Sequence, residues 1–263
     1  MNDIALPALE HTGDDYFDLN TARAAIDAGK PVRFPPFDVV HLPEYGLSVC
    51  LNLQRDPVQR SLRGGNFFEQ EELELLKDYV KRGAHIIDIG ANIGNHALFF
   101  ATQLKAQRVV VIEPNPLALA PLVANVLVNQ LTNVIDIGAL GVGLSDRSES
   151  GFGMKRHDRN LGATKMFAGK GKLQVHAGDD LFADETPDFI KIDVEGMEMQ
   201  VLAGLEATIT AHRPLLLIEI DNENDEAFEA WRETHKYDVV NTKKHYRKNC
   251  NYMLRAAEKN RGK

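Results

Sequence analysis

The chain has 263 residues and a mass of 29.3 kDa, which is enough for one domain with a full hydrophobic core. Its 44% of hydrophobic and 26% of charged residues are typical of a globular protein, and a net charge of −8 argues against a nucleic-acid partner. Neither Cys50 nor Cys250 belongs to a C-x-x-C pair, so the cysteines give no support to a zinc, haem or thioredoxin-type site. Because the sequence also has no apolar stretch of membrane-spanning length and no signal-peptide pattern, we expect a cytoplasmic protein with reduced thiols and no membrane partner.

The first part of the chain, residues 1–36, differs in composition from the rest. Leu19–Ala28 has the pattern of a short helix, with Asn20 or Thr21 as its capping residue and Gly29 as its end. Three prolines then prevent regular structure. We expect this segment to be an arm that packs on the domain or on a second copy of the chain, with a substrate lid as the alternative.

The remaining residues, 37–263, are expected to form the main domain. It should begin with a hairpin over residues 38–54 and a helix over Phe68–Val80. Apolar strands are predicted at His85–Ile89, Arg108–Ile112, Val134–Ile137, Asp188–Ile192 and Leu215–Ile220. Helices are predicted at Asn95–Leu104, Pro116–Leu131 and Glu223–His235, and two final short strands at Tyr237–Asn241 and Asn251–Leu254.

Near-continuous apolar strands that alternate with helices indicate a parallel sheet covered on both faces. The two short strands at the end of the chain predict an antiparallel pair at one edge of that sheet. The predicted fold is therefore an α/β Rossmann-like fold, with a mostly parallel sheet, a C-terminal antiparallel strand pair, and an N-terminal arm and hairpin.

The most informative segment is the turn of small residues that follows the strand His85–Ile89 and precedes a helix. Gly90 and Gly94 allow close approach to a ligand, and the N–H groups of the helix start attract an anion. These features would suit NAD as well as S-adenosylmethionine. However, Asn92 replaces the middle glycine of the dinucleotide pattern, and Asp88 would repel a pyrophosphate while attracting an ammonium or sulfonium group. The turn therefore favours S-adenosylmethionine.

A second acid supports this cofactor. Glu113 lies 23 residues after Gly90, at the end of the next strand, where a carboxylate can accept hydrogen bonds from both ribose hydroxyls. The residues predicted to bind the cofactor are Asp88, Gly90, Ala91, Asn92, Gly94, Asn95, Glu113, Pro114, Asn115 and Asp193.

These segments together resemble the FkbM-type family of S-adenosylmethionine-dependent methyltransferases. The matching stretches are Asp88–Gly94, Glu113–Asn115, Leu144–Asp146, Lys191–Gly196, and Arg213-Pro214 with Leu216–Glu219. Lys191–Gly196 is the most specific of them, because the glycine turn occurs throughout the methyltransferases of this fold. The resemblance extends over roughly residues 38 to 255. It implies a class I methyltransferase fold, and O-methylation of a hydroxyl on a sugar or secondary metabolite, with a small-molecule or glycan acceptor.

Acceptors bind beyond the carboxyl ends of the strands, so Asp193 should face the transferred methyl group. The chain lacks the Pro-Pro-aromatic and Pro-Cys patterns of nucleobase methylation, which leaves an oxygen as the favoured acceptor. Asp193 and Glu195 are the candidates for a general base, with His96 in reserve. The alternative for both acids is a capping role at a helix start, weighed evenly for Asp193 and preferred for Glu195.

A magnesium site is a further hypothesis. Oxygen ligands from Asp193, Glu219, Asp221 and Asn222 could hold Mg²⁺ and orient the acceptor oxygen. The same run of acids also suits the start of a helix, and we prefer the interpretation without a metal.

Two polar segments could contact an acceptor. The long connection over residues 143–178 carries Lys155, Arg156, His157, Arg159 and Asn160, and its alternative interpretation is a solvated excursion with a short hairpin. The basic run Lys243–Lys248 is expected to be a solvated loop, with contact to phosphate or acidic glycan as the alternative.

Two other functions compete with methyl transfer. One is an NAD-dependent oxidoreductase or sugar-modifying enzyme, which is disfavoured by Asn92, by Asp88 and by the absence of a Tyr-x-x-x-Lys couple. The other is a non-catalytic module that kept the fold, which is disfavoured by the presence of Asp88, Glu113 and Asp193.

Overall fold

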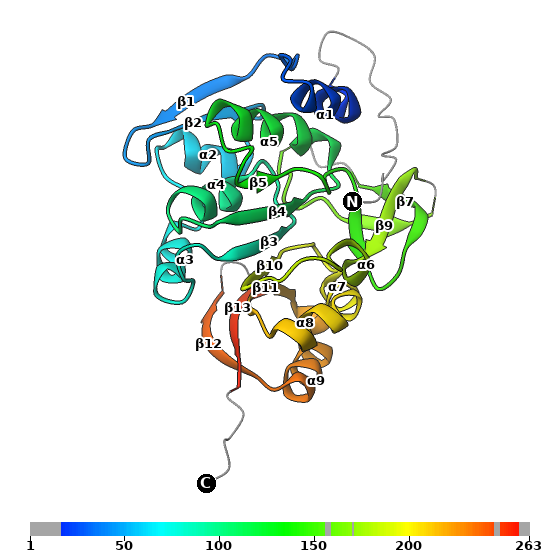
Figure 1. Ribbon diagram of the computed structural model, residues 1–263. Coiled ribbons are helices and arrows are strands. Elements are labelled where there is room, and N and C mark those ends of the chain that lie inside the picture. Colours follow the sequence, from blue (N-terminus) through cyan, green and yellow to red (C-terminus); the bar gives the residue numbers. More distant parts are fainter. Residues whose placement is uncertain (1–16, 156–158, 170, 245–247, 258–263) are drawn as a thin grey trace.

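The computed structural model describes residues 17–155, 159–169, 171–244 and 248–257, and these form an α/β fold around a seven-stranded sheet (Figure 1). The elements of the first half are α1 (Leu19–Asp27), β1 (Asp38–Leu42), β2 (Leu47–Leu51), α2 (Pro57–Arg63), α3 (Gln70–Leu75), the 3₁₀ turn η1 (Leu76–Asp78), β3 (His85–Ile89), α4 (Asn95–Thr102), β4 (Arg108–Ile112), α5 (Pro116–Val128) and β5 (Ile135–Asp136).

The elements of the second half are β6 (Gly143–Ser145), β7 (Glu149–Met154), β8 (Met166–Ala168), β9 (Leu173–Ala177), α6 (Gly178–Leu181), β10 (Phe189–Ile192), α7 (Glu198–Gly204), α8 (Glu206–His212), β11 (Leu215–Asp221), the 3₁₀ turn η2 (Asn222–Asn224), α9 (Asp225–His235), β12 (Tyr237–Lys243) and β13 (Asn249–Ala256).

The large sheet has the strand order β12-β13-β11-β10-β3-β4-β5. The strands β11, β10, β3, β4 and β5 run parallel to one another. The strand β13 pairs antiparallel with both β11 and β12. The predicted mostly parallel sheet with a C-terminal antiparallel pair is therefore confirmed. Among the described helices, none is both long enough and apolar enough to cross a bilayer.

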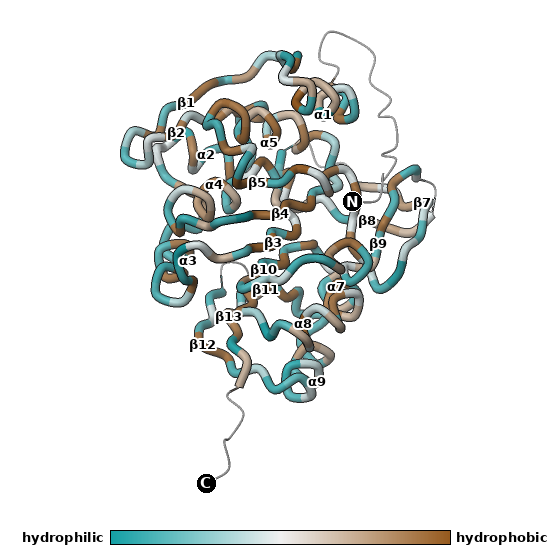
Figure 2. Tube along the Cα trace, in the orientation of Figure 1, coloured by the Kyte–Doolittle hydropathy of each residue, from teal (hydrophilic) through white to brown (hydrophobic). Residues whose placement is uncertain are grey.

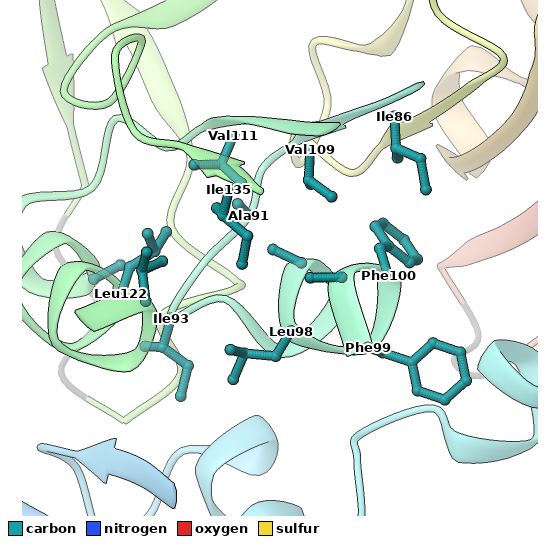
Figure 3. Close-up of a cluster of buried hydrophobic side chains, with 14 of the residues drawn as sticks. Ile86, Ala91, Ile93, Leu98, Phe99, Phe100, Val109, Val111, Leu122 and Ile135 are labelled. Atoms are coloured by element: carbon teal, nitrogen blue, oxygen red, sulfur yellow. The ribbon is translucent and has the colours of Figure 1, made fainter. Parts of the chain in front are cut away.

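The apolar strands pack helices on both faces because their successive side chains point to opposite sides. Ile86 and Val109 belong to the core on the side of α4 and α5, whereas Ile87 and Val110 belong to the core on the side of α7, α8 and α9. In Figure 3, Phe100 of α4 lies close to Ile86 and Val109. The hydropathy colouring in Figure 2 shows hydrophobic stretches in the central strands and hydrophilic stretches in the outer turns.

The N-terminal hairpin is attached to the domain through α5. Asn125 of this helix and its C-cap Asn129 accept hydrogen bonds from the backbone N–H groups of Cys50 and Ser48, at 2.6 and 2.9 Å. The helix α1 lies near the same end of the molecule (Figure 1). Its N-cap is Asp18, which accepts a hydrogen bond from the N–H of Thr21, so the prediction that Asn20 or Thr21 caps the helix was wrong.

Residues 1–16 of the predicted arm lie outside the described residues, and its division from the domain at residue 36 stays a prediction. Cys50 and Cys250 are both free thiols, as expected. Cys50 is buried, and Cys250 is half-buried.

The connection over residues 143–178 is more ordered than the sequence indicated. Its short hairpin is present as β7 and β8, but β6 and β9 join it in a four-stranded sheet of order β6-β9-β7-β8. Phe152, Leu173 and Val175 form a small apolar cluster of their own on this sheet. The alternative interpretation, a solvated excursion with a short hairpin, was thus right about the hairpin but missed the strands β6 and β9. These strands were missed because they are short, and β6 begins with a glycine.

Candidate functional site

The carboxyl ends of β3, β4, β10 and β11 border two adjoining cavities. The larger measures about 580 Å³ and the smaller about 50 Å³. Gly90, Asn92, Asp193 and Glu195 line both of them. The volume of the larger cavity lies within the range of small-molecule sites. The smaller cavity is narrow, but two methionines line it, and their flexible side chains can adapt to a ligand.

The turn after β3 is fixed against the two neighbouring strands. The N–H groups of Gly90 and Ala91 both donate to the carbonyl of Ile112 at the end of β4. Gly90 has a φ of 79°, and a Cβ at this position would lie 1.8 Å from the carbonyl oxygen of Asp193. Only glycine therefore allows β3 and β10 to end this close together.

Glu113 supports this turn as well as lining the smaller cavity. Its Oε2 accepts a hydrogen bond from the N–H of Asn92 and its Oε1 accepts one from the N–H of Asn115, both at 2.7 Å. Burial raises the pKa of Glu113 to about 7, although the two backbone N–H groups oppose this shift. Each carboxylate oxygen keeps a further lone pair, so Glu113 can still accept hydrogen bonds from a ligand.

The two predicted residues that follow Glu113 line the smaller cavity, and one of them also caps a helix. Pro114 and Asn115 line the smaller cavity. Asn115 is also the N-cap of α5, where its side chain accepts a hydrogen bond from the N–H of Leu117 at 3.1 Å. Its amide nitrogen donates to Thr164 at 3.3 Å, which connects α5 to the segment between β7 and β8.

Asp88 does not line either cavity, because its side chain is completely buried beneath the turn. The β3–β10 register places Asp88 directly opposite Lys191, whose Nζ lies 3.3 Å from Asp88 Oδ1. The same ammonium lies 3.4 Å from Asp193 Oδ2 and donates to the carbonyl of Gly90 at 2.8 Å. No role for Lys191 was predicted from the sequence, although a lysine inside an apolar strand is the feature that could have revealed one.

The capping interpretation of Asp193 and Glu195 was wrong. The next helix, α7, begins only at Glu198, and its N-cap is Met197. Glu195 instead adopts a left-handed conformation with a φ of 53°, which holds its side chain beside both cavities. Burial raises the pKa of Glu195 to about 7, and repulsion from Asp193 adds to this shift.

Three carboxylates converge at the border of the larger cavity. Single carboxylate oxygens of Asp193, Glu195 and Glu219 lie within 4.8 Å of one another, a separation at which they could share a metal ion. Burial raises the pKa of Glu219 to about 9, with repulsion from Asp193 and Glu195 as further causes, while a hydrogen bond from Asn249 opposes the shift. Glu195 was not among the residues predicted from the sequence to bind Mg²⁺.

Two members of the predicted metal set stand apart from this cluster. The carboxylate of Asp221 pairs with Lys165 at 2.7 Å. Asn222 lines the larger cavity, but the carboxylates that converge are those of Asp193, Glu195 and Glu219. The acids at the end of β11 therefore do not act as one group.

The start of α4 forms another wall of the larger cavity through Asn95 and His96. The side chain of Asn95 exchanges two hydrogen bonds with the backbone of Phe68, at 3.0 and 3.2 Å. His96 Nε2 lies 3.4 Å from Oε2 of Glu69, and both side chains are about nine-tenths buried. Glu69, the N-cap of α3, was not predicted to lie at the site. Nothing in its local sequence pattern distinguishes it from the acids of the helix that follows.

The two polar segments, residues 143–178 and Lys243–Lys248, each contribute only some of their residues to the wall of the larger cavity. Asn160 and Lys165 line the larger cavity, and the N–H of Leu161 donates to Asp56 at 2.8 Å. Lys155 and Arg159 do not line it, and Arg156 and His157 lie outside the described residues. At the basic run, Lys248 lines the cavity, whereas Lys243 pairs with Glu71 at 2.7 Å.

Comparison with known proteins agrees with this geometry. Residues 88–252 match the family described as the methyltransferase FkbM domain. Among curated proteins, the chain is 29% identical over 151 residues to the hexuronic acid methyltransferase AglP of Haloferax volcanii, covering 56% of this chain and 58% of that protein. It is also 32% identical over 79 residues to the ribosomal protein L11 methyltransferase of Heliobacterium modesticaldum, covering 29% of this chain and 25% of that protein. The matches thus span less than two thirds of either relative.

A solved structure shows the same fold. The tRNA m1G37 methyltransferase of M. jannaschii superposes with a TM-score of 0.51 and 11% sequence identity, over 87% of this chain and 59% of that one. This likeness concerns the fold alone. The predicted Rossmann-like methyltransferase architecture is confirmed.

Proposed function

The chain belongs to the FkbM methyltransferase family, and from this premise we propose that it transfers a methyl group from S-adenosylmethionine to a hydroxyl oxygen of a sugar or secondary metabolite. The observation that carries the proposal is the junction of the two cavities at the carboxyl ends of β3, β4 and β10. The narrow cavity at Gly90 and Glu113 opens beside the larger one, and this arrangement supports a cofactor that reaches toward an acceptor in the larger cavity.

The residues at this junction suit S-adenosylmethionine. Glu113 offers buried carboxylate oxygens to the two ribose hydroxyls, and Gly90 borders both cavities. The backbone N–H groups at the start of α4 suit its carboxylate, and Asp193 suits its cationic groups. When bound there, the cofactor supplies an electrophilic methyl group whose leaving group is a neutral thioether.

The larger cavity has an acidic wall. Among the described residues, six acids and three lysines line the larger cavity. Two of these lysines are already paired, Lys165 with Asp221 and Lys191 with Asp88 and Asp193. This charge, together with the net charge of −8, supports a small-molecule or glycan acceptor rather than a polynucleotide. The curated relative AglP is named for an acidic sugar, so uronic acids belong in any panel of acceptors.

Glu195 is the residue we assign as general base. It lines both cavities, and a pKa of about 7 matches the proton affinity that a base needs near neutral pH. Its carboxylate would hold the hydroxyl proton of the acceptor, while Asp193 stays paired with Lys191. Glu219, with a pKa of about 9, keeps its proton at neutral pH and is available as a hydrogen-bond donor. This assignment does not require a metal ion.

The cofactor proposal predicts that S-adenosylhomocysteine binds and that NAD⁺ does not, as measured by calorimetric titration of the purified protein. Glu113→Ala should weaken the binding of S-adenosylhomocysteine by about 10- to 100-fold, because a buried charged acceptor and the support of two N–H groups are lost. Glu149→Ala removes an exposed acid of the same length and should leave the affinity unchanged. Preferential binding of NAD⁺ would contradict the proposal.

The reaction itself is tested by transfer of a labelled methyl group to a panel of neutral, amino and uronic sugars. With the best acceptor, the rate should rise with pH through about 7, because Glu195 accepts a proton only when it is ionised. Glu195→Gln should lower kcat by about 10²- to 10⁴-fold and remove this rise.

Glu223→Gln is the matched control, because Glu223 lines the same cavity but is exposed. It should keep the pH profile of the wild type. An unchanged kcat in Glu195→Gln would exclude Glu195 as the base, and labelling of a nitrogen instead of an oxygen would contradict O-methylation.

A further inference from the structure

Lys191 is a buried cation at the point where β3 and β10 end. Residue 191 pairs with residue 88 in the parallel register of these strands, and side chains at paired positions project from the same face. Asp193 follows two residues later, so its side chain leaves β10 toward the same side. The register therefore brings one ammonium between two carboxylates, at 3.3 Å from Asp88 and 3.4 Å from Asp193.

The two carboxylates differ in their surroundings. Asp88 is fully buried, and within the described part of the chain neither of its oxygens accepts a hydrogen bond. Its negative charge is therefore compensated by Lys191, itself only 3% exposed. Asp193 is about one-third exposed and lines both cavities. Two negative charges and one positive charge leave this group with one excess negative charge, which faces the ligand through Asp193.

The lysine is charged in this setting. Burial alone would lower the pKa of Lys191, but attraction to Asp88 and Asp193 outweighs burial and raises it above its ordinary value. Its hydrogen bond to the carbonyl of Gly90 also fixes the ammonium directly beneath the turn. Lys191 also lines the larger cavity, so its unit charge acts directly on the electrostatic potential there.

We propose that Lys191 is a specificity-determining residue that sets the charge of the cofactor site, and thereby its preference between the cationic methyl donor and the neutral product. The inference rests on the proposed cofactor. S-adenosylmethionine and S-adenosylhomocysteine differ by a methyl group and one positive charge on sulfur. An excess of one negative charge attracts the donor more than the product, whereas a larger excess strengthens this preference and a neutral group removes it.

The test uses the ratio of the two dissociation constants, product over donor, measured by calorimetry on the same protein sample. Asp88→Asn makes the group neutral, and the double variant Asp88→Asn/Lys191→Met restores one negative charge. Lys191→Met alone also keeps one negative charge, because the buried carboxyl of Asp88 takes up a proton when its cation is lost. Asp88→Asn should therefore lower the ratio on the order of tenfold after allowance for solvent screening, and Lys191→Met should leave it near the wild-type value. The double variant should return to the wild-type ratio.

A merely structural role would not produce this order, because a distorted site weakens both ligands together and leaves their ratio unchanged. If Lys191→Met does not fold, Asp88→Asn and the double variant still provide the comparison, since neither leaves a buried carboxylate without its cation. A ratio that is the same in all folded variants would overturn the role of Lys191 and leave the cofactor assignment intact. A wild type that binds neither compound would overturn the proposed cofactor and this inference with it.

Discussion

Gly90→Ala is expected to abolish tight cofactor binding. The new Cβ would lie 1.8 Å from the carbonyl oxygen of Asp193, and backbone on both sides would have to move to remove the overlap. Because that movement separates the ends of β3 and β10, it displaces Asp193 as well as the turn itself. We expect a loss of affinity for S-adenosylhomocysteine of about 100-fold and a destabilisation of at least ~2 kcal/mol. Calorimetry and urea unfolding measure the two effects.

Gly83→Ala is the control variant, because it measures the cost of an alanine with a positive φ without a steric overlap. Gly83 has a φ of 76°, close to the 79° of Gly90, but its Cβ would meet no atom within 4 Å. It should cost only the conformational strain, about 1 kcal/mol, and leave the affinity unchanged. Equal losses in both variants would show that close approach at Gly90 is not what the site requires.

Glu219→Gln is expected to stabilise the protein, by an amount that grows with pH. The folded state holds the pKa of Glu219 at about 9, compared with 4.5 for the unperturbed group, so the folded state binds the proton more tightly than the unfolded state. Below pH 4.5 the side chain is protonated in both states and its replacement by Gln should change little. Above that pH the unfolded state ionises first, and the stability of the wild type falls until the folded carboxyl ionises near pH 9.

Gln carries no charge and avoids this loss. At pH 9 we expect the free energy of unfolding of the variant to exceed that of the wild type by a few kcal/mol. This is about half of what the full difference in pKa would give, because the cavity admits solvent that screens the charge. Urea unfolding at pH 5, 7 and 9 with EDTA present measures the difference without interference from bound metal. Glu226→Gln, on the exposed surface of α9, should show no such trend. A difference that is independent of pH would contradict the electrostatic origin.

The acidic cluster therefore lowers stability at the pH where the base must work. Glu195 and Glu219 repel one another and Asp193 across the border of the cavity, and this repulsion contributes to a pKa of about 7 for one and about 9 for the other. Such raised values are typical of sites where proton transfer takes place. The negative charge of these carboxylates would also attract a cationic ligand to the larger cavity.

The sequence by itself predicted the parts of this protein that depend on local pattern. Alternating apolar strands and helices predicted the parallel sheet, and the small residues from Gly90 to Gly94 predicted the turn between β3 and α4 that borders the two cavities. The position of Glu113 followed from the length of one β-α-β unit. These predictions were accurate because side-chain period and glycine conformation are properties of a few neighbouring residues.

Sequence patterns were insufficient where the outcome depends on contacts between distant segments. The strands β6 and β9 find partners only through pairing across a long connection, so their short sequences were not recognised. Glu69 reaches His96 because two hydrogen bonds tie Phe68 to Asn95, a contact that no local pattern encodes. Asp193 and Glu195 had the pattern of helix caps, but the chain turns away before α7 begins.

The charge of the site shows the same division most clearly. The sequence determined that Asp88, Lys191, Asp193, Glu195 and Glu219 would lie at or near the ends of buried strands. Only the register of β3 with β10 decided that Lys191 would lie between Asp88 and Asp193, and only the neighbouring β11 brought Glu219 to the other two acids. The physical reason is that a pKa depends on burial and on charges a few ångströms away, and both are set by which strands become neighbours.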